Sequence, residues 1–150
     1  MNVYLRPLTE ADYPLTMAWR SNPLVYQGFY SQYESLKWEE HILWIRSRNS
    51  GWRNFVVMYN DRPVGVVTIC QLDHWSPEIG YYIGEVSLWG RGIGKEAVRQ
   101  GLQYIKNFGR DYCHTTVLNE NTRSLKLLKS LGFKKMGEAR KGEVWLTLKM

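Results

Sequence analysis

Three glycines alternate with larger residues in the segment Leu-Trp-Gly-Arg-Gly-Ile-Gly-Lys-Glu-Ala-Val at 88–98, and this spacing restricts the fold more than any other feature of the chain. The segment ends an extended run and opens an amphipathic pattern, which predicts a junction from strand to helix. Glycine lets the backbone turn tightly and expose consecutive N–H groups. The new helix directs its partial positive end at the loop, where Arg91 and Lys95 add two charges. The loop therefore predicts an anion site, with a pyrophosphate as the expected ligand.

Two common phosphate-binding loops do not fit this segment. An NTPase loop places Lys-Ser or Lys-Thr after its last glycine, whereas Lys95 and Glu96 follow here. The dinucleotide-binding fingerprint needs the spacing G-x-G-x-x-G, whereas these glycines run G-x-G-x-G. A turn that merely requires glycine is the remaining structural interpretation.

The composition fits one folded domain over residues 1–150. With 44% hydrophobic residues, a chain of this length can bury a core of its own. The 20 basic and 14 acidic residues give a net charge of +6, which suits nucleic acid as well as a phosphorylated cofactor and an anionic substrate. Because the basic residues form no long run, we expect no nucleic-acid partner.

Two further patterns concern location and metal binding. The sequence has no signal-peptide pattern and no long apolar span, so we expect a cytoplasmic protein without a membrane partner. Cys70 and Cys113 lie in apolar strand-like runs, which predicts small buried thiols. Neither cysteine has the spacing of a metal ligand, so no metal site is expected.

The pattern of apolar residues predicts a mixed α/β single domain. Strands are expected over 2–7, 55–59, 64–72, 77–87, 112–118, 133–138 and 144–148. Helices are expected from the Thr9–Asp12 capping pair to about Arg20, over 36–48, from near Gly94 through a buried face of Ala97, Val98, Leu102, Ile105 and Phe108, and over 121–131. This order places the glycine loop at the carboxyl ends of the strands, where such sheets usually have a ligand-binding crevice.

Two separated blocks carry a resemblance to a known family. The first is Trp-Gly-Arg-Gly-Ile-Gly at 89–94 with Glu96 and Ala97 after it, and the second runs from Asn-Thr-Arg-Ser at 121–124 to Leu-Gly-Phe at 131–133. Both blocks, in this order, resemble the GNAT superfamily of acetyl-CoA-dependent N-acetyltransferases. The resemblance implies a GNAT-like mixed sheet with a splayed central strand pair and flanking helices. It also implies acetyl-CoA as cosubstrate, a small-molecule amine acceptor, and a monomer or homodimer.

Shorter segments resemble two different branches of that superfamily. Trp-Gly-x-Gly at 89–92 and Glu-Ile-Gly-Tyr at 78–81 are similar to the RimJ/RimL-like branch, which acetylates protein N-termini and many small amines. The segments at 19–23, 41–44 and 82–84 are similar to the amino-sugar-nucleotide N-acetyltransferases of the pseudaminic acid pathway. Both branches stay open at this point.

The resemblance assigns cofactor binding to the glycine-bearing strand, the loop and the second block. These residues are Ile83, Gly84, Glu85, Trp89, Gly90, Arg91, Gly92, Ile93, Gly94, Lys95, Asn121 and Ser124. Gly84 is expected to let the thioester approach closely, and a backbone N–H there to stabilise the oxyanion. A simple β-bulge at Gly84 and a helix cap at Asn121 are the structural alternatives.

Acetyl transfer to an amine needs a base, because a protonated amine is not nucleophilic. Glu78 falls on the position that resembles the family's usual carboxylate, and it could act directly or through water. Glu85 is the reserve candidate, and Asp73 or His74 is a third. The structural alternative is a Glu78 that only pairs with a neighbouring cation.

The proton donor for the leaving thiolate is unassigned. Many members of the superfamily carry a tyrosine seven residues after the asparagine of the second block, where this chain has Leu128. Ser124 lies one turn earlier on the expected helix and could hydrogen-bond the sulfur. A tyrosine of the aromatic loop such as Tyr30, or solvent, could serve instead.

The acceptor is expected to bind through Trp19, Arg20, Tyr30 and Tyr81. Aromatic faces stack on a nucleobase or on the C–H face of a sugar, and an arginine can hold a diphosphate, which together favour a nucleotide-linked amino sugar. A core position for Trp19 and a structural hydrogen bond for His41 are the alternatives. A protein N-terminal acetyltransferase and a non-catalytic regulatory protein that binds acetyl-CoA are the rival functions.

Overall fold

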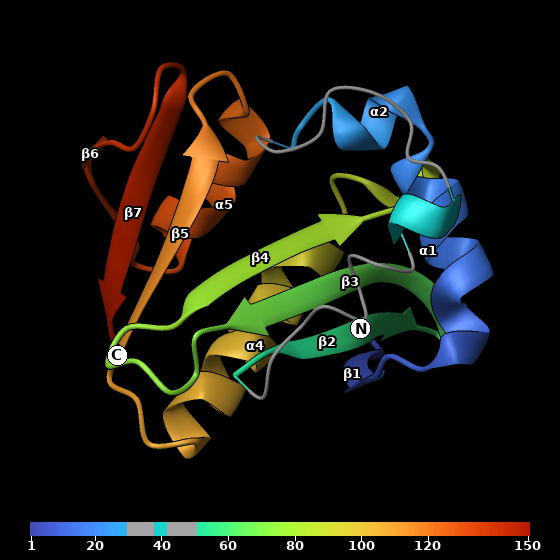
Figure 1. The fold of residues 1–150 in the computed structure, drawn as a ribbon, viewed down its shortest axis with the longest axis horizontal. Helices are drawn as coiled ribbons and strands as arrows, with labels where there is room; N and C mark the ends of the chain where they lie inside the picture. The colour runs from blue at the N-terminus through green and yellow to red at the C-terminus, as the bar shows by residue number, and fades with distance from the viewer. Residues whose placement is uncertain (30–37, 42–50) are drawn as a thin grey trace.

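The computed structural model describes residues 1–29, 38–41 and 51–150. In this part of the chain, seven strands form one mixed sheet in the order β1-β2-β3-β4-β5-β7-β6 (Figure 1). The strands are β1 (Val3–Pro7), β2 (Arg53–Tyr59), β3 (Arg62–Cys70), β4 (Glu78–Ile83), β5 (Tyr112–Leu118), β6 (Lys134–Glu138) and β7 (Glu143–Lys149). The helices include α1 (Tyr13–Arg20), α2 (Pro23–Tyr26), α4 (Ile93–Asn107) and α5 (Thr122–Ser130), with 3₁₀ turns η1 (Glu10–Asp12) and η2 (Val86–Leu88). The expected mixed α/β fold is confirmed.

Strands β1 to β4 form an antiparallel half-sheet. β2 pairs with β1 on one side and β3 on the other, and β3 pairs with β4. The β2–β3 hairpin turns at Asn60 and Asp61, whose φ angles are 50° and 62°. A left-handed conformation at both central residues matches the twist of the flanking strands, and asparagine and aspartate tolerate it better than most residues. The turn expected at this point is confirmed, although β3 begins at Arg62 instead of Val64.

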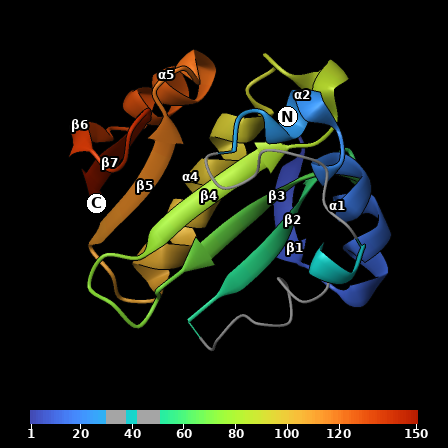
Figure 2. The ribbon, with the colours of Figure 1, turned by 45° about the horizontal axis from the view of Figure 1, so that its top comes forward.

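Strands β4 and β5 run parallel but separate along their length, as Figures 1 and 2 show. Their ladder in the described residues consists of one register pair, Glu78 with His114. The N–H of His114 donates to the carbonyl of Pro77 at 2.9 Å, just before β4 begins. From there β5 follows its antiparallel partner β7, while β4 follows β3. The splayed central strand pair that the family resemblance implies is therefore present.

Helix α4 covers one face of the antiparallel half-sheet and crosses behind β3 and β4 in Figure 1. Its buried residues are Ile93, Ala97, Val98, Gly101, Leu102 and Ile105. A Cβ at Gly101 would lie 2.8 Å from Ile79 Cδ1, so glycine lets the helix lie close to the sheet. The expected burial of Phe108 is wrong, because this residue caps the end of α4 and is 45% exposed, with the Arg110 guanidinium 5.7 Å from its ring centroid.

One strand is shorter than expected, and one expected helix lies mostly outside the described residues. The strand expected over 77–87 ends at Ile83, because the N–H groups of Gly84 and Glu85 both donate to the carbonyl of Val64, at 2.8 and 3.3 Å. A shared acceptor breaks the regular alternation of an antiparallel ladder, and the chain turns into η2. The helix expected over 36–48 lies mostly outside the described residues, of which 38–41 are helical.

The N-terminal capping pair and the two thiols agree with expectation. The Thr9 N–H donates to Asp12 Oδ2 at 2.8 Å, immediately before α1. Cys70 and Cys113 are both thiols buried in the sheet. Within the described ranges, no helix is long and apolar enough to cross a membrane.

Candidate active site

The glycine loop between η2 and α4 needs its glycines for two different reasons. Gly90 and Gly92 have φ angles of 82° and 83°, in the left-handed region that side chains other than glycine rarely adopt. Gly94 instead lies in the first turn of α4, where an added Cβ would be 3.1 Å from Cε2 of Tyr81. The first turn of a helix leaves N–H groups without intrahelical acceptors, and the helix dipole favours an anion there.

A cavity of about 600 Å³ lies against this loop and extends along the open edge of β4. We call it the cofactor cavity. Its lining includes Ile83, Trp89, Gly90, Gly92, Ile93, Gly94, Lys95, Asn121, Arg123 and Ser124. Of the two expected loop cations, Lys95 lines this cavity, whereas Arg91 is exposed and is not among the described lining residues.

Arg123 is a site residue that sequence reasoning missed. Its guanidinium lies 4.2 Å from the centroid of the Trp89 ring, over the face of the indole. The indole N–H of Trp89 in turn donates to the carbonyl of Ile83 at 2.8 Å, which ties the loop to the end of β4. The only signal in the sequence was the place of Arg123 inside the second family block.

The main chain of β4 presents two residues to the cofactor cavity. Because Gly84 N–H bonds to Val64 of β3, the alternation of the antiparallel ladder directs the main-chain groups of Tyr81 and Ile83 to the opposite edge, toward β5. Both residues line the cofactor cavity. The Ile83 carbonyl accepts from Trp89. Among the described residues, β4 and β5 pair only at Glu78 and His114, so the ladder does not extend to Tyr81 and Ile83.

Gly84 does not have the role expected of it. Its N–H is directed at Val64 on the other strand, away from the cavity. A Cβ at this position would lie 2.1 Å from the Trp19 ring, so the glycine makes room for that indole. Trp19 is 5% exposed and donates its indole N–H to Glu85 Oε1 at 3.0 Å. Gly84, Glu85 and Trp19 are absent from the described lining of both cavities, and their contacts are those of a packed core.

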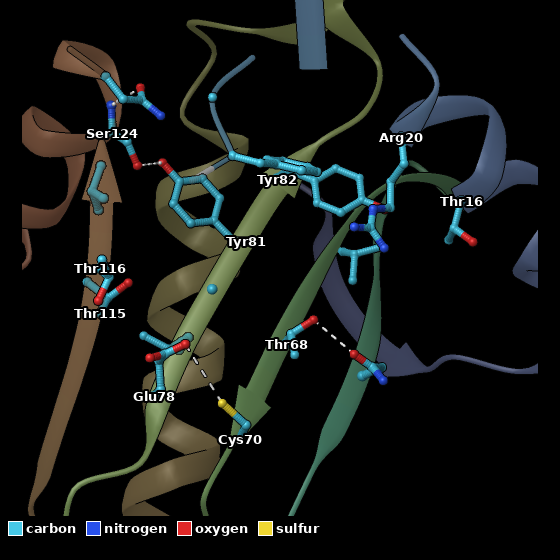
Figure 3. Close-up of a pocket in the computed structure, with 18 of the residues that line it drawn as sticks. Thr16, Arg20, Thr68, Cys70, Glu78, Tyr81, Tyr82, Thr115, Thr116 and Ser124 are labelled. Carbon is cyan, nitrogen blue, oxygen red and sulfur yellow. Dashed lines mark hydrogen bonds between the residues drawn. The ribbon is translucent and has the colours of Figure 1, made fainter. Parts of the chain in front are cut away.

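A second cavity, of about 210 Å³, lies on the other side of β4 (Figure 3). We call it the acceptor cavity. Its lining includes Thr16, Arg20, Phe29, His41, Thr68, Cys70, Glu78, Tyr81, Tyr82, Thr115, Thr116, Asn121, Ser124 and Leu128. Six described residues line both cavities, namely Gly28, Phe29, Tyr81, Tyr82, Asn121 and Ser124. The two cavities therefore meet between β4 and the start of α5. The expected acceptor residue Tyr30 lies outside the described residues.

Glu78 enters the acceptor cavity at the start of β4. Its carboxylate accepts from the Cys70 thiol at 3.9 Å through Oε1, and Oε2 lies 3.5 Å from Nε2 of His114. His114 Nδ1 is 3.3 Å from the hydroxyl of Ser76. The other carboxylate and imidazole considered from the sequence, Asp73 and His74, are exposed and do not belong to the described lining of either cavity.

A buried cation and aromatic rings form the far wall of the acceptor cavity. Arg20 is 7% exposed, with its guanidinium 5.8 Å from the Phe29 ring centroid. Burial lowers the pKa of Arg20, and the phenol of Tyr82 partly offsets this effect. Burial likewise raises the pKa of Tyr82, against the lowering effect of the Arg20 charge. In Figure 3 the Tyr82 ring points toward Arg20.

His41 has the structural hydrogen bond that the sequence suggested. The ring is 1% exposed and its Nε2 lies 2.8 Å from Thr16 Oγ1. Burial, followed by the positive charge of Arg20, lowers the pKa of His41 from 6.5 to about 4. The imidazole is therefore neutral at physiological pH.

A further polar contact lies where the two cavities meet. The Tyr81 hydroxyl and the Ser124 hydroxyl lie 2.9 Å apart. The N–H of Ser124 donates to Asn121 Oδ1 at 3.3 Å, which confirms that Asn121 caps α5. Leu128 is 1% exposed and belongs to the hydrophobic core. Among residues 1–29, 38–41 and 51–150, no cluster of histidine, cysteine and acidic side chains is placed to hold a metal ion.

Comparison with known proteins identifies the family. Residues 2–134 match the family model described as the acetyltransferase (GNAT) domain. The chain belongs to this family. The match spans the glycine loop and the described lining of both cavities, and it ends at the start of β6.

The chain is also similar to individual proteins and solved structures. The GNAT domain is 44% identical over 147 residues to the uncharacterized protein MJ1062 of Methanocaldococcus jannaschii, in a match that covers 96% of this chain and 30% of that protein. A domain from Methanocaldococcus jannaschii DSM 2661 has a crystal structure that is 42% identical, with a TM-score of 0.94 and 99% of both chains covered. Aminoglycoside acetyltransferase AAC(6')-Ib in complex with coenzyme A gives a TM-score of 0.85 at 16% identity over 99% of this chain and 95% of that one, which shows a shared fold.

Proposed function

We propose that this GNAT domain transfers an acetyl group from acetyl-CoA to the primary amine of a small acceptor, by direct attack of the amine on the thioester. The observation that carries the proposal is the meeting of two cavities between the splayed strands β4 and β5. A cofactor in the larger cavity and an amine in the smaller one approach each other at the shared wall. Such an arrangement brings the reacting atoms together without a covalent enzyme intermediate.

Acetyl-CoA fits the cofactor cavity by its chemistry. The first-turn N–H groups of α4 and the cations Lys95 and Arg123 suit a pyrophosphate, so Arg123 joins the residues that we propose for the cofactor. The open edge of β4 at Tyr81 and Ile83 suits the amide groups of pantetheine, which can pair with it as a further strand does. Arg91, on the exposed side of the loop, is left with a long-range contribution.

The reaction then needs an oxyanion donor and a base. We assign the oxyanion donor to the N–H of Tyr81 in place of Gly84, because the ladder directs Tyr81 toward the cofactor cavity. Glu78 is the base: it takes a proton from the attacking amine, and His114 at 3.5 Å is placed to accept that proton in turn. Glu85 is a weaker candidate, since its Oε1 accepts from Trp19.

For the acceptor we favour a nucleotide-linked amino sugar. Arg20 offers a guanidinium to a diphosphate, and Phe29 and Tyr82 offer aromatic faces to a base or a sugar. A peptide N-terminus would need neither feature. Protein N-terminal acetylation of the RimJ/RimL type is the second candidate, because the strand motif Glu78–Tyr81 resembles that branch.

An acceptor screen tests the proposal. The purified protein is mixed with acetyl-CoA and a panel of amines that includes a UDP-amino sugar, peptides with free N-termini and simple polyamines, and thiol release is measured. We expect release with the UDP-amino sugar and a product of the corresponding acetylated mass. Acetylation of the peptides alone would contradict the amino-sugar acceptor and favour the RimJ/RimL-type function. Binding of acetyl-CoA in calorimetry without transfer to any amine would make the domain a regulatory sensor and overturn the enzymatic proposal.

A further inference from the structure

Departure of coenzyme A leaves a thiolate, and a hydroxyl at the right place can protonate it as the bond breaks. The sulfur of a thioester must lie where the cofactor cavity meets the acceptor cavity. Among the described residues shared by the two cavities, the hydroxyl groups belong to Tyr81, Tyr82 and Ser124. Leu128 on the next turn of α5 is buried in the core and has no proton to give.

The two tyrosines point in different directions. Successive side chains of a strand alternate between its faces, and Figure 3 shows Tyr82 directed at Arg20 in the acceptor cavity and Tyr81 directed at Ser124 on α5. The Tyr81 hydroxyl lies 2.9 Å from the Ser124 hydroxyl. Tyr81 is therefore the phenol on the side of the cofactor cavity.

The glycine loop is shaped around the same ring. A Cβ at Gly94 would lie 3.1 Å from Cε2 of Tyr81, so the first turn of α4 has a gap where the ring passes. Ser124 is 8% exposed and its backbone is held by the Asn121 cap. Helix α4 therefore packs against the Tyr81 ring, and helix α5 contacts its hydroxyl through Ser124.

We propose that Tyr81 is the general acid of the transfer, with Ser124 as the residue that positions it; this inference rests on the proposed acetyltransferase function. When the tetrahedral intermediate collapses, the oxygen lone pair re-forms the carbonyl and the C–S bond breaks with its electron pair going to sulfur. The proton of Tyr81 Oη passes to that sulfur and gives the thiol of coenzyme A. The phenolate regains a proton from the Ser124 hydroxyl, which is replenished from solvent in the cofactor cavity.

The electrostatic surroundings keep the proton on Tyr81 until it is needed. Burial raises the pKa of Tyr81 above its usual 10.0, while the hydrogen bond to Ser124 and the charge of Arg123 oppose that rise. The phenol is therefore protonated throughout the neutral range. The proton can then move to the sulfur as negative charge develops on it during cleavage of the C–S bond.

Steady-state kinetics with the best acceptor of the screen provide the first test. Tyr81→Phe removes one oxygen, and we expect kcat to fall roughly 10²-fold while the KM for acetyl-CoA changes little. Ser124→Ala keeps the phenol and should lower kcat by a smaller factor. Tyr104→Phe is the matched control, because it removes a hydroxyl that accepts from Arg53 and belongs to a residue outside the described lining of both cavities. A larger loss in Ser124→Ala than in Tyr81→Phe would give the acid role to the serine and overturn the proposal.

A titration of bound coenzyme A provides a readout that does not depend on the acceptor. The thiolate absorbs in the ultraviolet, and the difference between protein with coenzyme A and protein with desulfo-coenzyme A reports the pKa of the bound thiol. A phenol that donates to the sulfur stabilises the thiolate, so we expect this pKa to be lower in the wild type than in Tyr81→Phe by roughly one unit. Equal values would show that the phenol does not touch the sulfur and would overturn the proposal.

The two tests separate this inference from the function on which it rests. A wild type that acetylates no amine refutes the transferase activity. A wild type that turns over, with Tyr81→Phe unchanged in kcat and in the thiol pKa, refutes only the role of Tyr81. If Tyr81→Phe loses its cooperative thermal transition, the same titration on Ser124→Ala tests the role of Tyr81. Without its positioning partner the phenol should stabilise the thiolate less, so the thiol pKa should be higher than in the wild type, by less than about one unit. A thiol pKa equal to that of the wild type would overturn the proposal.

Discussion

Glu78 occupies the point where β4 and β5 still pair, next to Cys70 on one neighbouring strand and His114 on the other. Its side chain is 29% exposed and faces the acceptor cavity, whereas His114 lies behind it and contacts Ser76. A carboxylate in this place reaches an amine in the cavity on one side and an imidazole on the other. The pair suits a base that passes its proton onward.

Glu78→Gln should lower turnover by a factor of roughly 10² to 10⁴ near neutral pH, because the amide keeps the shape of the side chain and cannot take a proton. Binding of acetyl-CoA, measured by calorimetry, should be nearly unchanged. Glu138→Gln on the exposed strand β6 is the control for the loss of one negative charge. If Glu78→Gln kept more than about a third of the wild-type rate, the base would be Glu85 or solvent.

His41 links stability to pH. Its pKa is lowered from 6.5 to about 4 in the folded protein, so the unfolded chain binds a proton more readily in that interval. The contribution of neutral His41 to the free energy of unfolding should therefore be fully present above pH 6.5 and be lost as the pH falls toward about 4. Thermal melting curves across this interval measure the decline. His41→Gln should flatten it, while an equally steep decline in that variant would assign the effect to another group.

The element that we propose as the cofactor site is the junction of η2, the glycine loop and α4. Gly90 and Gly92 are required for their backbone angles, since an added Cβ would meet nothing within 4 Å at Gly90 and only Met1 Cε at 3.9 Å at Gly92. The helix that follows is anchored by its buried face and begins at Ile93. A substitution that moves the backbone at position 92 out of the left-handed region should therefore displace the N–H groups at the start of α4.

Gly92→Val should weaken binding of coenzyme A by more than about tenfold, since valine is strained at this φ angle and would displace the N–H groups at the start of α4. Calorimetry with coenzyme A measures the change. Gly142→Val is a matched control: its φ angle is 80°, its Cβ would also meet nothing within 4 Å, and it lies in the turn before β7. An unchanged affinity in a folded Gly92→Val variant would mean that the loop is not the pyrophosphate site.

At the scale of the whole molecule, the splay of the sheet decides where chemistry can happen. The antiparallel strands β1 to β4 and the group β5, β7 and β6 are held together by one register pair and by helices α4 and α5, which contact each other. Tyr81 and Ser124 contact each other across this space and line both cavities. The proposed function therefore gives the acceptor and the cofactor separate binding surfaces with one shared wall.

Arg20→Ala tests that separation. A charged hydrogen bond is worth about 1.5 to 3 kcal/mol, so losing it to an anionic acceptor should raise the acceptor KM more than about tenfold. The KM for acetyl-CoA should stay the same, because Arg20 is not among the described residues of the cofactor cavity. Arg62→Ala at the exposed β2–β3 turn controls for net charge. Equal increases in both constants would show that Arg20 supports the fold instead of the acceptor.

The sequence by itself determined the order of elements, the hairpin turn at Asn60 and the strand-to-helix junction at the glycine loop, because each depends on local backbone angles or on the period of apolar residues. The splayed strand pair came from the family resemblance carried by its two blocks. Only the tertiary structure decided which side chains meet. Trp19 contacts Glu85 66 positions later, and Tyr81 contacts Ser124 43 positions later. Such contacts follow from strand register and from how far two strands separate, which are set by the packing of the whole sheet and are not encoded in any local pattern.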